Sequence, residues 1–228
     1  MQRGHTDRVY EAQLEAVRRN LIVMAGRVEE MIAHAVKALV ERDVELARRT
    51  IGQDPKVNYC EVETDELCMQ ILARRQPLAS DLRFVTLALK MVTDLERIGD
   101  LAVNISHRAI DMANEAPLKP WRDVPRMADI VQSMVRDAID AFVRSDPVQA
   151  QAVIERDEQV DEIYTHVIRE LLGIMADDGS SVERGIHVLS VAKFLERMAD
   201  HATNLAEQVV FMVKGKDVRH IGKLPDLR

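Results

Sequence analysis

The feature that most constrains the fold of this chain is an internal repeat. The segments VEEMIAHAVKALVERD (28–43) and VQSMVRDAIDAFVRSD (131–146) share Val, Met, Ala, Val and Asp in place, at an offset of 103 residues. Further along, LERIGDLAVNI (95–105) matches LERMADHATNL (195–205) at an offset of 100 residues. A period of about 100 residues is too long for a solenoid repeat. The repeat therefore predicts one structural unit that occurs twice.

The sequence pattern inside each unit is helical. Apolar residues in 28–43 recur at the i, i+3, i+4, i+7 spacing of an amphipathic helix, at Val28, Met31, Ile32, Ala35, Val36, Leu39 and Val40. No stretch alternates convincingly between apolar and polar residues, as a half-buried strand would. The chain also has only 9 Gly, 7 Pro and 4% aromatic residues, which favours helices over sheets.

Helix-breaking residues divide the chain into six long helices, three in each unit. Gly52 and Pro55 indicate a kink or short break in the second helix, and Ser80 and Ser180 are expected to cap the third helix of each unit. We predict an all-α, spectrin-like fold of two tandem three-helix bundles. The expected boundaries are 1–113 for the first bundle, 114–120 for a linker, 121–216 for the second bundle and 217–228 for a C-terminal tail.

Composition limits the classes of function. The net charge of −7 argues against a protein whose main role is to coat nucleic acid. No uncharged apolar run approaches the roughly 18 residues of a membrane span, and the first residues contain no apolar signal segment, so we expect a cytoplasmic protein. Cys60 and Cys68 lie about 12 Å apart along a helix, too far for a disulfide, and are expected to be reduced.

A repeated polar signature lies in the third helix of each unit. The pattern Leu-Glu-Arg-x-x-Asp-x-x-x-Asn gives two rows of oxygen-bearing side chains, Glu96, Asp100 and Asn104 in the first unit and Glu196, Asp200 and Asn204 in the second. A spacing of four residues places successive side chains one turn apart, along the edge of the apolar stripe. Neighbouring carboxylates repel by roughly 0.2–0.5 kcal/mol, and a bound cation would relieve this repulsion. Oxygen ligands suit Mg²⁺, Ca²⁺ or Mn²⁺, and iron can join them.

Further ligands are expected from the second helix of each unit: Glu61 and Asp65 in the first, Asp157 and Asp161 in the second. Two other interpretations stay open. The acids of the third helices are alternatively partners of Arg97 and Arg197 in inter-helix salt bridges, and those of the second helices are alternatively ordinary solvated side chains. The sequence contains no GxSxG, P-loop, GxGxxG, HExxH or Glu-x-x-His pattern. Its scattered histidines, His34 and His166 among them, are interpreted as surface or core residues.

The chain resembles the PhoU family of bacterial phosphate-transport regulatory proteins. The resemblance rests on RRQPLASDLR (74–83), on the paired LERIGD (95–100) and LERMAD (195–200), and on VKGKDVRHIG (213–222), and it extends from about residue 8 to residue 222. The second copy departs from the first by replacing Gly99 with Ala199, which is expected to change how closely a neighbouring helix approaches.

The resemblance implies a non-enzymatic, cytoplasmic and often dimeric protein built from two similar three-helix bundles. It implies a negative regulator of the phosphate-starvation response and of high-affinity phosphate uptake. The implied partners are the ATPase subunit of the phosphate ABC transporter and a sensor histidine kinase, with no nucleic acid and at most peripheral membrane association. The family's metal-binding motifs correspond here to Glu96/Asp100 and Glu196/Asp200, then to Glu61/Asp65 and Asp157/Asp161, for Mg, Mn, Fe or Zn ions. The alternative is a metal-binding helical protein with storage or hydrolytic activity.

Overall fold

A computed structural model describes residues 3–115, 118 and 123–215, and these residues form helices with no strand. The first half holds α1 (Arg3–Glu41), α2 (Val44–Ile51), α3 (Asp54–Arg75) and α4 (Ala79–Asp111). The second half holds α5 (Asp123–Arg144), α6 (Pro147–Asp177), the short 3₁₀ helix η2 (Gly179–Ser181) and α7 (Val182–Lys214). The predicted all-α fold class is confirmed.

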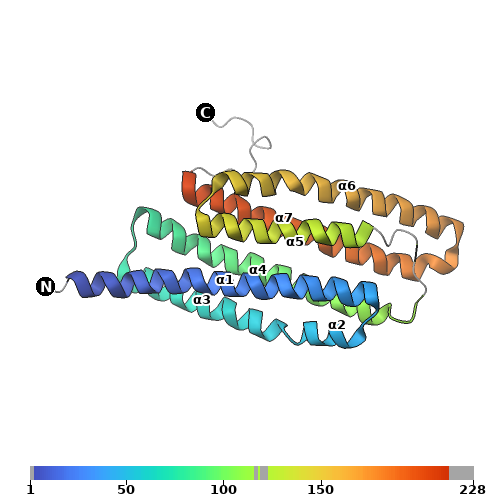
Figure 1. Ribbon diagram of the computed structural model, residues 1–228, viewed down its shortest axis with the longest axis horizontal. Coiled ribbons are helices and arrows are strands. Elements are labelled where there is room, and N and C mark those ends of the chain that lie inside the picture. Colours follow the sequence, from blue (N-terminus) through green and yellow to red (C-terminus); the bar gives the residue numbers. More distant parts are fainter. Residues whose placement is uncertain (1–2, 116–117, 119–122, 216–228) are drawn as a thin grey trace.

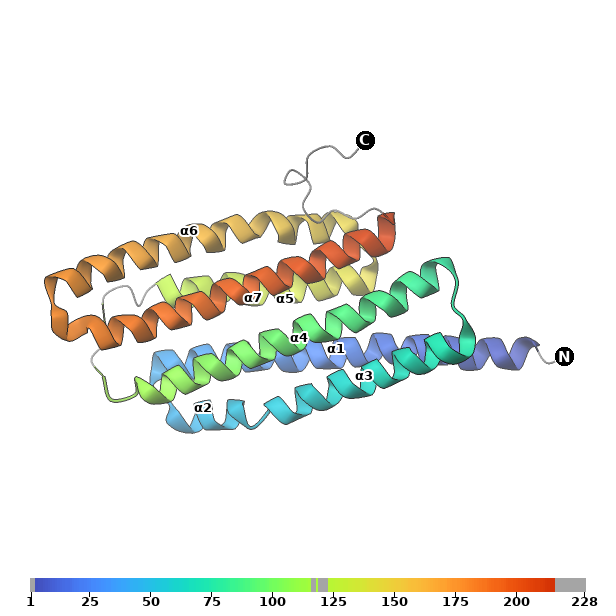
Figure 2. The ribbon, with the colours of Figure 1, turned by 180° about the vertical axis from the view of Figure 1, so that it is seen from behind.

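The two halves are helical bundles that lie side by side along their length (Figure 1). In the view from behind, α4 and α7 run next to each other, with α3 and α6 on their outer sides (Figure 2). On the opposite side of the molecule, α1 contacts α5. Each of these two contacts joins a helix to its own counterpart in the repeat. One continuous core of buried apolar side chains runs through both bundles.

The helix boundaries follow the sequence only in part. Asp146 caps α6 as its place before Pro147 suggests, because its carboxylate accepts hydrogen bonds from the N–H groups of Val148 and Gln149. The Gly52–Pro55 region separates α2 from α3, so the first half has four helices where three were expected. No side chain caps α4 or α7, and the predicted capping by Ser80 and Ser180 is wrong.

Several sequence expectations concern residues at the ends and the middle of the chain. Most of the predicted linker, 116–117 and 119–120 of 114–120, and the whole predicted tail, 217–228, lie outside the described residues. Within the described part, Cys60 and Cys68 are buried free thiols. No helix among the described residues has both the length and the apolar character needed to cross a membrane.

Two of the side-chain clusters that join the bundles involve α4. The rings of Phe84 on α4 and Phe142 on α5 stack with centroids 5.8 Å apart, and the guanidinium of Arg18 lies 5.2 Å and 5.6 Å from their centroids. On the other side of the interface, α4 presents Asp94 to α7. Its carboxylate lies 2.9 Å from His201 Nδ1, and it accepts hydrogen bonds from Gln208 at 2.7 Å and from Asn204 at 3.4 Å.

Candidate functional site

Acidic side chains of neighbouring helices converge at equivalent places in the two bundles. We call the set between α3 and α4 the first acidic cluster; it contains Asp54, Asn58, Glu61 and Asp65 of α3 with Glu96 and Asp100 of α4. We call the set between α6 and α7 the second acidic cluster; it contains Asp157, Asp161, Glu196 and Asp200. The structure therefore brings each predicted Glu/Asp pair of the third helix together with predicted acids of the second helix.

The helix positions of Glu96 and Glu196 explain why these two side chains are mostly buried. On α7, Leu195 and Ala199 are fully buried, and Glu196 and Asp200 are the residues that follow each of them. The Glu96 and Glu196 side chains keep only 17% and 15% of their surface exposed. The rows thus follow the edge of the apolar stripe, as the helical pattern predicts, and both solvent and the adjacent helix reach them.

Burial and mutual repulsion raise the pKa values in the first acidic cluster. Desolvation is the largest cause of the raised pKa of Glu61, and the neighbouring charges of Asp65 and Asp100 add to it. The pKa of Glu96 is raised by desolvation and then by Asp100, Glu61 and Asp54. Desolvation also raises the pKa of Asp65. The carboxylates are therefore close enough to disfavour each other's charged forms, which is the condition that a bound cation relieves.

The second acidic cluster shows the same kind of electrostatics. Burial raises the pKa of Asp157 to about 6, with further contributions from Asp161 and Asp200. The pKa values of Asp161 and Asp200 are also raised, in each case mainly by desolvation and then by the charge of Glu196. Asp157 and Glu196 are half-buried whereas Asp161 and Asp200 are exposed, so the carboxylates from α6 and α7 share a site that stays open to solvent.

Each cluster also contains one basic side chain. Arg97 lies 3.6 Å from Glu96 and 3.6 Å from Asp100, both on its own helix, so the salt bridges it forms here are not the inter-helix ones that the sequence left open. In the second cluster Lys193 Nζ lies 2.6 Å from Glu196 Oε2 and 5.4 Å from the centroid of the Tyr164 ring. One cation beside several carboxylates leaves each cluster with an excess of negative charge.

The first acidic cluster fits a hard metal ion in its donor chemistry. Asp54 Oδ1, Asn58 Oδ1 and Asp65 Oδ1 are buried oxygens that accept no hydrogen bond. Buried oxygens that accept no hydrogen bond are rare in proteins, because burial removes their hydrogen bonds to water and nothing offsets that free-energy cost. Carboxylate and amide oxygens are the ligands that Mg²⁺, Ca²⁺ and Mn²⁺ prefer. The donor types therefore suit a cation, but Asp54 and Asp65 lie about 16 Å apart along α3 and do not share one ion. Among the described residues, no three acidic or histidine donors of this cluster lie within 4.8 Å of one another.

Sequence reasoning missed Asp54 and Asn58 as members of the first acidic cluster. The repeat itself carries the signal, since DPKVN (54–58) aligns with DEQVD (157–161) at the offset of 103 residues. This alignment makes Asp54 the counterpart of Asp157 and Asn58 the counterpart of Asp161. The predicted first-half ligands, Glu61 and Asp65, lie further along the same face of α3.

The two predicted asparagine ligands are placed less favourably for metal binding than the acids of the same rows. Successive positions in the Glu-Asp-Asn row rotate by about 40° around the helix, because four residues advance by 400°. Asn204 consequently points towards the other bundle and donates to Asp94. Asn104 is exposed on α4. The Gly99 position matters less than expected, since a Cβ there would lie 3.4 Å from Val57 Cγ1, which is ordinary contact.

Comparison with known proteins gives matches over nearly the whole chain. A "Phosphate-specific transport system accessory protein PhoU homolog" of Pseudomonas putida is 43% identical over 219 residues, 96% of this chain and 86% of that protein. The crystal structure of PhoU from Pseudomonas aeruginosa superposes with a TM-score of 0.89 at 40% identity, covering 91% of this chain and 100% of that one. The phosphate transport system regulatory protein PhoU of Streptococcus pneumoniae gives 0.86 at 28% identity, covering 92% and 99%.

The repeat has a direct counterpart in these comparisons. The profile of the PhoU domain matches residues 21–109 and again residues 124–209, once in each half of the chain. Each matched segment contains one of the two acidic clusters. With a duplicated helical unit, a high structural similarity over nine-tenths of the chain and a domain match in both halves, this chain belongs to the PhoU family.

Proposed function

We propose that this protein is a cytoplasmic, non-enzymatic accessory protein of phosphate transport that represses the phosphate-starvation response and limits high-affinity phosphate uptake. It acts as an adaptor between the ATPase subunit of the phosphate ABC transporter and a sensor histidine kinase, as a homodimer. Family membership supports the phosphate-transport role, because relatives along nearly the full chain are described as accessory or regulatory proteins of that system.

The observation that carries the proposal is the pair of acidic clusters on one helical body. The helix pairs that hold them, α3/α4 and α6/α7, lie on either side of the α4–α7 contact (Figure 2). The body therefore presents two similar, separated and strongly negative sites. Such an arrangement suits a protein that contacts two partners at once, with binding driven partly by charge complementarity.

We also assign divalent or iron-type cations, among Mg, Mn, Fe and Zn, to the two acidic clusters. Glu61, Glu96 and Asp100, whose charges act on one another, would hold the ion in the first cluster, and the four carboxylates of the second would hold its counterpart. A bound cation would offset the repulsion that raises the pKa values of these acids. It would also join α3 to α4 and α6 to α7 through shared ligands.

A phosphate-starvation reporter in the host tests the regulatory role. The reporter is read in phosphate-rich medium with the gene intact, deleted, and restored on a plasmid. We expect high output only in the deletion strain. Low output in all three strains would remove the chain from this pathway.

A pull-down tests the adaptor role separately. Purified protein is incubated with the transporter ATPase subunit and with the sensor kinase, at low salt, with and without added metal. Retention of both partners supports the proposal. A variant with Glu96→Gln and Asp100→Asn reports whether the first acidic cluster contributes to either contact. Failure to retain either partner in any condition contradicts the adaptor role.

The second candidate is metal storage or metal-dependent hydrolysis, and one observation favours it. The pKa of Asp157, raised to about 6, lies in the range of a group that exchanges protons near neutral pH. Assays of phosphate-ester hydrolysis with several metals, using wild type and the Asp157→Asn variant, distinguish the candidates. Turnover that disappears in the variant supports hydrolysis, and inactivity with every metal rejects hydrolysis; storage requires that the purified protein retain many metal ions per chain, which elemental analysis measures.

A further inference from the structure

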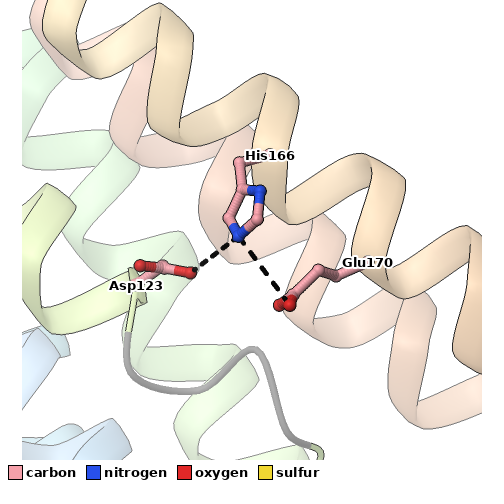
Figure 3. Close-up of side chains that lie close together, drawn as sticks. All are labelled: Asp123, His166 and Glu170. Atoms are coloured by element: carbon pink, nitrogen blue, oxygen red, sulfur yellow. Dashed lines mark ion pairs between the residues drawn. The ribbon is translucent and has the colours of Figure 1, made fainter.

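A third group of ligand-type side chains lies apart from both acidic clusters, at the start of the second bundle (Figure 3). Asp123 is the first residue of α5, whereas His166 and Glu170 are one turn apart on α6. His166 Nε2 lies 3.8 Å from Asp123 Oδ2 and 3.7 Å from Glu170 Oε1. We call these three residues the α5–α6 triad.

The geometry of the triad suits a single small ion. One donor atom from each residue lies within 4.8 Å of the other two, and Figure 3 shows the imidazole nitrogen facing both carboxylates. Bonds of about 2.0–2.2 Å from an ion to nitrogen and oxygen require donor atoms roughly 3–3.6 Å apart. The side chains are 25%, 60% and 44% exposed for Asp123, His166 and Glu170, so small rotations suffice to close the difference.

We propose that the α5–α6 triad is a binding site for a divalent transition-metal ion of the Zn²⁺ type. An imidazole nitrogen distinguishes it from the oxygen-only acidic clusters, because nitrogen ligands favour Zn²⁺ and its neighbours over Mg²⁺ and Ca²⁺. Two carboxylates with a neutral imidazole carry a charge of −2, which one divalent ion balances. Three protein ligands leave the remaining position to water.

The ordinary alternative is a charged histidine paired with two acids, and the chain contains a suitable comparison. Glu30 and His34 have the same four-residue spacing on α1, in the reverse order, with His34 Nδ1 4.0 Å from Glu30 Oε1. That pair is the usual surface contact between an acid and a histidine. The triad differs because a third donor, Asp123, arrives from another helix at 3.8 Å. His34 therefore provides a matched control.

The site has a structural consequence beyond the proposed adaptor role. An ion held by the triad ties the first residue of α5 to the middle of α6. Asp123 begins α5, the first helix of the second bundle. Metal binding at the triad would thus fix the point where the chain enters the second bundle. The triad shares no residue with either acidic cluster, so metal binding at the triad can be tested independently of metal binding at the clusters.

Metal binding to the full-length, tag-free, chelator-treated protein tests the proposal. Zn²⁺ is titrated in the presence of excess Mg²⁺, which competes for the oxygen-only sites, and affinity is measured by calorimetry. The variants are His166→Gln and Asp123→Asn, with His34→Gln as the control, and circular dichroism verifies their folding. We expect both triad variants to lose at least about tenfold in Zn²⁺ affinity at one site, while His34→Gln behaves as wild type.

Nitrogen-15 NMR of the histidine rings gives a second readout. On addition of Zn²⁺ we expect one of the 7 histidines to shift strongly at Nε2, and its signal to be absent from the His166→Gln spectrum. The same response is expected in a variant whose acidic clusters are neutralised at Glu96, Asp100, Glu196 and Asp200. If His166→Gln binds Zn²⁺ as tightly as His34→Gln, the triad is an ion pair and the proposal is wrong.

Discussion

The two acidic clusters occupy equivalent places in the repeat but differ in how their charges are compensated. In the first, Asn58 donates a hydrogen bond of 2.9 Å to Asp54. At the equivalent positions of the second stand two carboxylates, Asp157 and Asp161, which repel each other. A neutral donor that stabilises a carboxylate has thus been replaced by a like charge, and the pKa of Asp157 rises to about 6 as burial and this charge act together.

A second difference between the clusters involves two neighbouring positions, and it reduces the negative charge of the second cluster. In the first half Glu61 lies beside Thr93, which favours the charged form of Glu61. The repeat offsets place Tyr164 and Lys193 at the equivalent positions, and there the ammonium group lies over the aromatic ring. At this pair of positions the second cluster has no carboxylate where the first has Glu61, and it has the ammonium group of Lys193 where the first has the hydroxyl of Thr93. We infer that the duplicated sites, which share the same backbone arrangement, have diverged: the first cluster is the more negative one and the second is the less negative one.

The largest expected effect comes from neutralising one cluster at a time. Glu196→Gln with Asp200→Asn should lower the metal affinity of the second acidic cluster at least about 100-fold, with the helical circular dichroism signal unchanged. Glu96→Gln with Asp100→Asn should do the same for the first cluster only. Elemental analysis after gel filtration, with calorimetry, measures both. Global unfolding of either variant would mean that these acids are structural.

A smaller effect, on stability, is expected at the interface between the bundles, where equivalent positions of the two repeats also hold different residues. Asp94 has Phe194 as its counterpart, so its three contacts with α7 exist in one direction only. Asp94→Ala should destabilise the protein by about 2 kcal/mol, because hydrogen bonds to a charged group are lost and their partners remain half-buried. Urea unfolding measures this change. Asp94→Asn keeps one acceptor and should cost less; equal stability of all three proteins would contradict the role of Asp94.

Because Asn58 in the first cluster corresponds to Asp161 in the second, removing the charge of the neighbouring aspartate should stabilise the protein in the second cluster but not in the first. In metal-free protein at pH 7, Asp157→Asn should stabilise the fold by about 1 kcal/mol, after allowance for solvent screening. The raised pKa means that the folded protein holds this proton more tightly than the unfolded chain does. The destabilising contribution is therefore complete above about pH 6 and disappears as pH falls below the unfolded value of 3.8.

The matched substitution in the first cluster is Asp54→Asn, which removes a charged acceptor from Asn58 and should not stabilise the protein. Urea unfolding of both variants from about pH 3 to about pH 8, a range that includes the unfolded and the folded pKa values of Asp157, gives the comparison. Stabilisation by both substitutions to the same extent would show that the two clusters are electrostatically alike.

The smallest effect is expected from the cation of the second cluster. Lys193→Thr recreates the residue found at the equivalent place in the first half and removes a positive charge 2.6 Å from Glu196. Metal affinity of the second cluster should rise about fivefold, which corresponds to about 1 kcal/mol for a screened unit charge. Thr93→Lys should lower the affinity of the first cluster by a similar factor. Affinities that do not respond to either exchange would exclude charge as the cause of the difference.

Much of the fold could be predicted because the helical spacing of apolar residues and the internal repeat are both visible in the sequence. The apolar stripe from Val28 to Leu39 and the cap at Asp146 are local signals that correspond to the structure, whereas Val40, the last predicted member of the stripe, is exposed. The caps predicted at Ser80 and Ser180 are wrong because packing places the helix starts at Ala79 and Val182 instead. Local capping contributes about 1 kcal/mol, so packing of a long amphipathic helix readily overrides it.

The candidate site was only partly predictable for a different reason. A row on one helix, such as Glu196 and Asp200, is visible from spacing alone. Contacts between helices depend on rotation and register, which no local pattern fixes. The contact of Asp94 with His201 spans 107 residues in the sequence. Asp54 could have been assigned to the site by carrying the repeat alignment through to the second helix.

The pairing of helices across the interface has an evolutionary consequence. Helix α1 contacts its counterpart α5, and α4 contacts its counterpart α7. This is the relation found in a two-fold symmetric homodimer, in which the same surface of each subunit meets itself. A gene encoding a single repeat would therefore yield a self-associating subunit, and fusion of two copies would convert that dimer into one chain. Once fused, the copies are free to drift apart, as Asp94 and Phe194 have done.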